Sequence, residues 1–303
     1  MYYQDGITME AIADRTGQSR STISRLLRDA RAHGLVTITL RPPGQQRVQA
    51  LQVRLRDRFG VSATVVPVAP TMDERERLDA AAQEAAALID SLMDTSTVMG
   101  IAWGTTMTAV ADAIRPRPVP GARIVQLNGA IDSEGAGFDY ATAAISRLAQ
   151  KWDAQMHPFA VPAFFDYEDT RRAMWRERST RRILDLQNRT SIAAFGAGAF
   201  DSAVPSHVYA SGYFTKKVTE QLQADGVVGD VCTIALRADG SWRDIELNRR
   251  ATGPDPDRLK RIPRRILVGA GSSKARALRA ALLAGVATDL VVDESAAAGI
   301  LAD

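Results

Sequence analysis

Short apolar stretches alternate with helical patterns along most of this 303-residue chain, from residue 64 to residue 292. This alternation is typical of βαβ units, in which helices join parallel strands and cover the sheet. We therefore predict an α/β domain with a mostly parallel sheet and helices on both faces. Strands are expected at 64–68, 98–102, 124–127, 155–160, 192–195, 231–236, 266–268 and 290–292, and helices at 73–93, 105–114 and 140–152.

Residues 8–31 carry a different pattern, that of two short helices around a glycine. Gly17 suits the turn because glycine adopts positive φ without strain, and Ala13 is small enough to lie where two helices touch. Thr8 is a candidate N-cap of the first helix, and Ser19 or Ser21 of the second. Helical spacing places four apolar side chains on the inner side, Ile12, Ile23, Leu26 and Leu27. The segment predicts a helix-turn-helix.

The outer face of the second helix is basic and rich in hydroxyls. It comprises Arg20, Ser21, Thr22, Ser24, Arg25 and Arg28. Arginine can donate two hydrogen bonds to a guanine edge, and hydroxyls suit phosphates or base edges. From residue 15 to residue 41 there are six arginines and one acid, Asp29, a net charge of +5 that favours phosphate contacts. We predict that this helix reads double-stranded operator DNA. The alternative is a helical hairpin with a solvated basic face.

The next segment predicts the end of this small domain. Gly34 is expected to end the second helix, and residues 35–40 alternate like a short strand, which favours a winged variant. Residues 41–44 break regular structure, and 45–59 have a helical pattern. We expect a DNA-binding domain over 1–44, a linking helix over 45–59 and a second domain over 60–303.

Composition excludes several classes of protein. The sequence has neither a run of 18 apolar residues nor an apolar secretion signal at its start, so we expect a cytoplasmic protein without a membrane partner. The lone Cys232 permits no internal disulfide. Only three histidines occur, and they are scattered, so we expect no metal site and no cofactor.

Three glycine-rich loops follow predicted strands, where α/β sheets bind ligands. In the first, Gly104 lets the backbone approach a ligand, while Thr105 and Thr106 open a helix whose N–H groups can surround an anion. The second, residues 269–274, places Lys274 in a first helical turn, where lysine opposes the helix dipole. Both loops favour a phosphate site; the alternative is tight turns with N-caps. The third loop, residues 196–198, is weak evidence by itself.

Asp230 lies between a glycine-containing turn and an apolar stretch that we predict to be a strand. Its carboxylate could accept hydrogen bonds from sugar hydroxyls, or could cap the turn.

Over nearly its whole length the chain resembles the SorC family of bacterial sugar-responsive transcriptional regulators. The resemblance rests on YYQDGITMEAIA, SRSTISRLLRDARAHGLV, GIAWGTT, VQLNGA, GVVGDVC, GSSKARALRAALLAG and VVDESAA, which follow the family's order. It implies a winged helix-turn-helix followed by a domain like the sugar-phosphate isomerases, and a homodimer or homotetramer on palindromic operators. It also implies a phosphorylated sugar effector at Gly104, Thr105, Thr106, Gly129, Asp230, Gly271 and Lys274, of which Asp230 would contact sugar hydroxyls.

The sequence departs from this family at two places. Family members usually carry a further helix before Tyr2, so we expect the first helix to be truncated here. The second loop reads Gly269-Ala270-Gly271 where the family often has a glycine pair, and the extra methyl group would narrow the pocket.

Two arginine-rich segments, residues 171–182 and 258–265, stand outside these motifs. Solvated helix faces or subunit contacts would account for them; contacts with an effector phosphate or with DNA are the alternatives. For the whole chain, the leading hypothesis is a regulator of carbohydrate-metabolism genes switched by a phosphorylated sugar. The alternatives are an isomerase-like enzyme fused to a DNA-binding domain, for which only Asp230, Asp293 and Glu294 are candidate bases, and a DNA-binding scaffold with an empty pocket.

Overall fold

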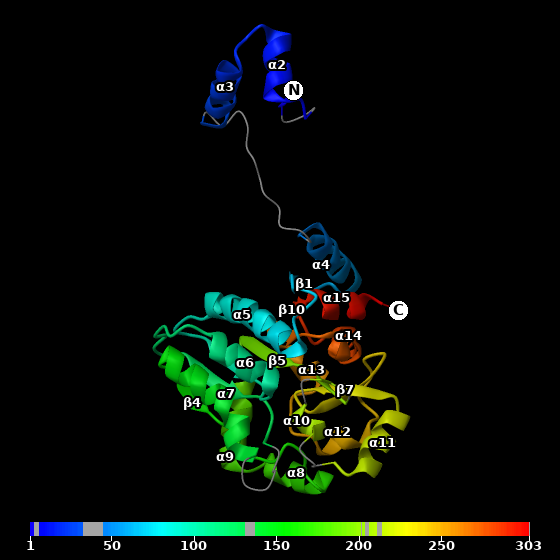
Figure 1. The fold of residues 1–303 in the computed structure, drawn as a ribbon. Helices are drawn as coiled ribbons and strands as arrows, with labels where there is room; N and C mark the ends of the chain where they lie inside the picture. Colours follow the sequence, from blue (N-terminus) through cyan, green and yellow to red (C-terminus); the bar gives the residue numbers. More distant parts are fainter. Residues whose placement is uncertain are drawn as a thin grey trace. The chain divides into compact units, whose positions relative to one another are not determined.

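A computed structural model describes residues 1–2, 6–32, 45–130, 137–200, 202–203, 206–210 and 214–302. The chain divides into two compact units, Met1–Gln45 and Gln46–Asp303 (Figure 1). The first unit contains α2 (Met9–Thr16) and α3 (Arg20–Ala32). The second contains all the strands of the described chain. The expected wing at residues 35–40 lies outside the described residues, as does part of the segment before α2.

The main sheet of the second unit is parallel throughout, in the order β1-β10-β9-β5-β2-β3-β4. Its strands are β1 (Ser62–Val66), β2 (Val98–Ile101), β3 (Arg123–Gln126), β4 (Gln155–His157), β5 (Ile192–Gly196), β9 (Arg264–Gly269) and β10 (Asp289–Asp293). The α/β architecture predicted from the sequence is therefore confirmed. β4 is shorter than expected because Pro158 has no N–H for the ladder, and the N–H of Phe159 donates to Gln126 Oε1 instead, at 3.2 Å.

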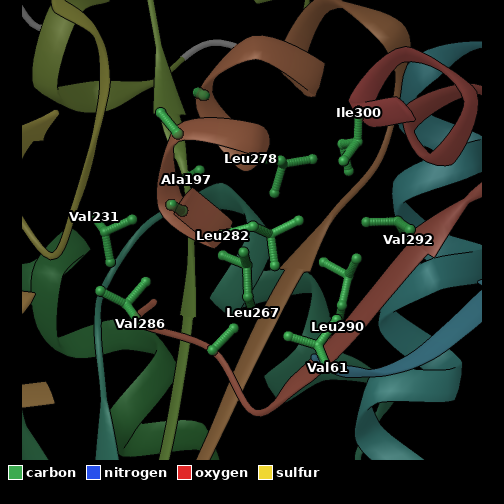
Figure 2. Close-up of a cluster of buried hydrophobic side chains, with 14 of the residues drawn as sticks. Val61, Ala197, Val231, Leu267, Leu278, Leu282, Val286, Leu290, Val292 and Ile300 are labelled. Atoms are coloured by element: carbon green, nitrogen blue, oxygen red, sulfur yellow. The ribbon is translucent and has the colours of Figure 1, made fainter. Parts of the chain in front are cut away.

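Alternate residues of the buried strands face two separate hydrophobic clusters. In β9, Leu267 belongs to one cluster, whereas Ile266 and Val268 belong to the other. The first cluster is covered by α4 (Gln45–Phe59), α14 (Ala275–Leu283) and α15 (Glu294–Leu301), the second by α5 (Glu74–Leu92), α6 (Thr105–Ala113) and α7 (Gly137–Trp152). Figure 2 shows part of the first cluster, with Leu278 and Leu282 beside Leu267. Helices thus cover both faces of the sheet.

The helix at 45–59 is more than a connection. Its side chains Val48, Leu51 and Leu55 are buried in the first cluster, and Leu55 is fully buried. The other side chains of this cluster come from β10, α14 and α15, among others. α4 is therefore part of the core of the second unit.

One predicted strand is wrong. Residues 231–236 form a hairpin rather than a continuous strand: β7 (Val227–Val231) turns at Cys232 and Thr233 into β8 (Ile234–Arg237). Both turn residues have positive φ, 50° and 70°, as a two-residue hairpin turn of this hand requires. With β6 (Gly198–Ala199), the hairpin makes a separate antiparallel sheet of three strands. Asp230 therefore lies inside a strand, not ahead of one.

Shorter helices complete the described part of the second unit. They are α8 (Glu168–Met174), α9 (Arg178–Gln187), α10 (His207–Ala210), α11 (Lys216–Ala224), α12 (Glu246–Arg250) and α13 (Pro256–Leu259), with the 3-10 turn η1 (Ser272–Lys274) ahead of α14.

Candidate functional site

The helix pair of the first unit has the local geometry that a helix-turn-helix needs. The Thr8 hydroxyl accepts a hydrogen bond from the N–H of Ala11 at 3.2 Å, which caps α2. Gly17 ends α2 in the left-handed region, with φ of 65°. Ile12, Ala13 and Ile23 are buried together, and Leu27 packs against them. These contacts fix α3 against α2.

Leu26 does not belong to this small core. The sequence predicts that it points inward, but its side chain is 55% exposed. Ile23 and Leu27 lie four residues apart and share one helix face, whereas Leu26 is displaced from Leu27 by about 100° around the helix axis. Leu26 therefore lies toward the exposed side of α3.

The residues proposed to contact DNA lie on the accessible side of α3. Arg20, Ser21, Ser24, Arg25 and Arg28 are exposed, and Thr22 is half-buried. Ser19 caps the helix, because its hydroxyl accepts from the N–H of Thr22 at 3.1 Å. It also bonds the hydroxyls of Ser21 and Thr22, at 2.7 and 2.8 Å. The face is positively charged, with no acidic residue in its first turn.

In the second unit, the loops after β2 and β5, the turn η1 and the hairpin converge on one pocket. Its lining includes Gly104, Thr105, Thr106, Asp230 and Lys274, all predicted from the sequence to bind the effector. Gly196 and Gly198, from the third glycine-rich loop, also line it. Because parallel strands end at one edge of the sheet, loops far apart in the sequence are brought to one place.

The start of α6 forms one wall of this pocket. Gly104 precedes the helix with φ of 135°, a conformation that only glycine adopts readily. The structure gives α6 no side-chain cap among the described residues. The first N–H groups of a helix have no partner within it and attract negative charge. This wall is therefore suited to an anion.

Lys274 supplies the positive charge of the pocket. Its side chain is buried, and its ammonium donates to the carbonyl of Ala197 at 3.3 Å. Burial lowers the pKa of Lys274, while the carboxylates of Asp230 and Glu74 oppose that shift. Of the described residues that line the pocket, Lys274 is the sole lysine or arginine.

Asp230 supplies a carboxylate to the same pocket. Burial raises its pKa to about 6, against the opposing effects of the Thr233 N–H, the Tyr209 hydroxyl and Lys274. The N–H of Thr233 donates to Oδ2 at 3.0 Å. Oδ1 is buried and has no hydrogen-bond partner among the described residues. Oδ1 is 2.1 Å from the position that a Cβ on residue 198 would occupy, which is too close for any side chain. Only glycine therefore fits in β6 at this point.

Two predicted effector residues, Gly129 and Gly271, are not brought to the described lining of the pocket. The N–H of Gly129 donates to Thr252 Oγ1 at 3.0 Å, and its carbonyl accepts from Trp103 Nε1 at 2.6 Å. The N–H of Gly271 donates to Asp293 Oδ1 at 2.9 Å. Both glycines shape loops of the site. Asn128, which precedes Gly129, lines the pocket instead. It was not predicted from the sequence, although it lies in the VQLNGA motif.

The arginine-rich segments make structural contacts outside the pocket. The Arg171 guanidinium lies over the Trp175 ring, 4.9 Å from its centroid, and donates to the Arg249 carbonyl. Arg265 donates to the carbonyl of Val286, and Arg264 pairs with Asp289 at 2.7 Å. None of these arginines is among the residues that line the pocket in the described chain.

The described residues contain neither a metal-binding cluster nor a membrane-spanning helix. Within them, no three His, Cys, Asp or Glu side chains are grouped so as to hold a metal ion. No helix of the described chain has the length and apolar character needed to cross a membrane.

The two units define a class of protein in which a helix-turn-helix is joined to an α/β ligand-binding domain, and the comparisons agree. Residues 45–302 match the family described as "Putative sugar-binding domain", and residues 1–47 match the MarR family. The chain belongs to this sugar-binding domain family, and its resemblance to the SorC regulators is confirmed.

Relatives align along nearly the whole chain. The Deoxyribonucleoside regulator of Bacillus subtilis is 28% identical over 304 residues, covering 100% of this chain and 95% of its own length. A crystal structure of a domain of "a possible sugar-binding transcriptional regulator" from Arthrobacter aurescens is 42% identical, with a TM-score of 0.79, over 87% of this chain and 100% of that one. The full-length Sorbitol Operon Regulator SorC of Klebsiella pneumoniae shares the fold, with 22% identity and a TM-score of 0.75 over 99% of this chain and 96% of that one.

Proposed function

We propose that this chain is a DNA-binding transcriptional regulator of carbohydrate-metabolism genes, switched by a phosphorylated sugar. The supporting observation is the pocket, in which the start of α6 and the buried Lys274 lie together with a carboxylate, Asp230. Anions bind at helix starts and at lysine, and sugar hydroxyls donate to carboxylates. The relatives compared are named regulators, so the enzyme alternative is not proposed.

We assign DNA binding to residues 1–44 and effector binding to residues 60–303; α4 joins the two in sequence and packs in the core of the second unit. α3 would enter the major groove and present Arg20, Arg25 and Arg28 to bases and phosphates. A homodimer or homotetramer acting in the cytoplasm would place two copies of α3 on a palindromic operator. The effector would favour one arrangement of the subunits and so change the spacing of the paired helices.

Variants of α3 and of the pocket, with opposite expected effects, test the two assignments. Arg20→Ala, Arg25→Ala and Arg28→Ala should each weaken binding to the DNA flanking the protein's own gene by about 5- to 150-fold, measured by fluorescence anisotropy. Lys274→Ala should retain DNA affinity and lose effector binding, measured by calorimetry. Arg181→Ala, on the exposed side of α9, is the matched control. Normal DNA affinity in all three arginine variants would refute the assignment of α3.

A further inference from the structure

Two buried acceptors in the pocket lack hydrogen-bond partners. They are Oδ1 of Asn128, a residue 2% exposed, and Oδ1 of Asp230, a residue 6% exposed. Both residues line the pocket, and neither atom has a partner among the described residues. Buried polar atoms are nearly always paired, because an unpaired one loses its hydration without compensation. Asn128 Oδ1 is therefore suited to a donor supplied by a bound molecule, and Asp230, whose carboxylate the Tyr209 hydroxyl also approaches, can accept a further one at Oδ1.

The backbone around Asn128 is held firmly, while its side chain is left available. Gln126 Nε2 donates to the Asn128 carbonyl at 2.8 Å, and Gln187 Nε2 donates to the Leu127 carbonyl at 3.2 Å. On the other side, Gly129 is held by Thr252 and by Trp103. These bonds fix the backbone on both sides of Asn128 before any ligand arrives, so the side chain starts from a defined position at the pocket.

The charges of the pocket allow one phosphate group. Lys274 is the sole lysine or arginine in the described lining, and it faces the carboxylate of Asp230. The residues of the second unit that lie outside the described ranges, 131–136, 201, 204–205, 211–213 and 303, contain no lysine or arginine in their sequence. A phosphate monoester carries about −1.5 to −2 charges at neutral pH. One cation and one helix start can balance a single such group, and a second would meet Asp230.

We infer that the effector is a sugar monophosphate whose hydroxyls donate to Asn128 and Asp230, and that Asn128 determines specificity by selecting hydroxyls over a second anionic group. The inference rests on the proposed function and deepens it. Bisphosphates and phosphorylated sugar acids are disfavoured, because their second negative group would meet Asp230 and Asn128 Oδ1, and the described lining has no cation besides Lys274 to balance it.

Matched ligands test the charge argument on the wild-type full chain. Calorimetry compares ribose 5-phosphate, glucose 6-phosphate and fructose 6-phosphate with ribose 1,5-bisphosphate, glucose 1,6-bisphosphate and fructose 1,6-bisphosphate; 6-phosphogluconate and inorganic phosphate are also titrated. At least one monophosphate should bind about 10-fold or more tightly than its bisphosphate and than 6-phosphogluconate. A bisphosphate or the sugar acid as the tightest ligand would overturn the inference and leave the proposed function standing. Failure of every phosphorylated compound to bind would overturn both.

Variants at residue 128 test the hydroxyl argument. Asn128→Ala should weaken the best monophosphate about 10-fold and leave the affinity for inorganic phosphate unchanged, since only the sugar hydroxyls lose an acceptor. Asn128→Asp should weaken that monophosphate further, because a second carboxylate then stands near Asp230. Asn188→Ala, an exposed asparagine, is the control. Thermal unfolding checks that each variant is folded. Two results in folded Asn128→Ala would contradict a role in selecting hydroxyls. One is an equal loss of affinity for inorganic phosphate and for the sugar phosphate, and the other is no loss of affinity for either.

Discussion

At the scale of single residues, Asp230 is held where its charge opposes folding. Its pKa is about 6 in the folded protein and 3.8 in an exposed chain. The folded protein therefore binds this proton more tightly than the unfolded chain does. The stabilising contribution of the protonated form is complete below about pH 4 and is lost as the pH rises through about 6. A carboxylate of this kind is retained at a cost in stability, as expected of a ligand-binding group.

Asp230→Asn should remove this pH dependence. The free energy of unfolding at pH 7 should rise by about 3 kcal/mol, less the stabilisation that Lys274 loses when its neighbouring charge is removed. Between pH 4 and pH 6 the variant should lose less stability than the wild type. Urea unfolding at several pH values measures both effects, with Asp57→Asn, at an exposed position, as the control. A wild-type pH profile retained in Asp230→Asn would contradict the burial argument.

Most residues of the pocket can be predicted from the sequence, because they belong to short loop motifs whose residue types indicate anion binding. Glycine and hydroxyl residues after a strand indicate Gly104 and Thr106, and a lysine against the helix dipole indicates Lys274. Asn128 could not be chosen over Gly129 in this way. The difference depends on Thr252, a residue 123 positions away that binds the N–H of Gly129. The residues next to Gly129 in the sequence do not indicate this contact with Thr252.

At the scale of elements, the turn between α2 and α3 depends on one glycine. Gly17→Ala places a side chain at φ of 65° and should destabilise this helix pair by about 1 kcal/mol, whereas Gly17→Asn should cost less because asparagine tolerates this region. Faster hydrogen exchange of the α2 and α3 amides, with unchanged exchange in β9, is the expected readout. Equal protection in Gly17→Ala and the wild type would show that the turn does not limit this unit.

The packing of α4 gives a second prediction for an element. Leu55→Ala should lower the free energy of unfolding of the second unit by about 2–5 kcal/mol, because it leaves a cavity in a closed core. Val53→Ala on the same helix, at a side chain 43% exposed, should change it by less than about 0.5 kcal/mol. Denaturant unfolding followed by the tryptophans of the second unit distinguishes them. Similar small losses in both variants would mean that α4 is only a connection.

Elements with a clear period were predicted well, and the one error has a physical cause. An apolar run such as 231–236 fits a buried strand equally well whether or not a turn interrupts it. Cys232 and Thr233 occupy the two turn positions with positive φ. Asn and Gly at these positions would have predicted a hairpin, whereas Cys and Thr do not. Val231 and Leu236, on either side of the turn, are buried in the cluster that α14 covers. The turn therefore forms although Cys and Thr do not favour positive φ.

At the scale of the whole molecule, two units with separate cores carry separate tasks in the proposed function. Mutations in the pocket and on α3 should therefore act independently on binding and together on regulation. The coupling of effector to operator affinity in such proteins is typically about 1–3 kcal/mol, or about 5- to 150-fold.

The measurement that tests the central claim most directly is the affinity of the full chain for operator DNA, titrated with the best sugar monophosphate and with the same sugar unphosphorylated. The account predicts that the phosphorylated form changes DNA affinity by about 5-fold or more and that the free sugar does not. It further predicts that Lys274→Ala retains the DNA affinity of the ligand-free wild type and loses the response. An equal response to the free sugar, or an unchanged response in Lys274→Ala, would contradict it.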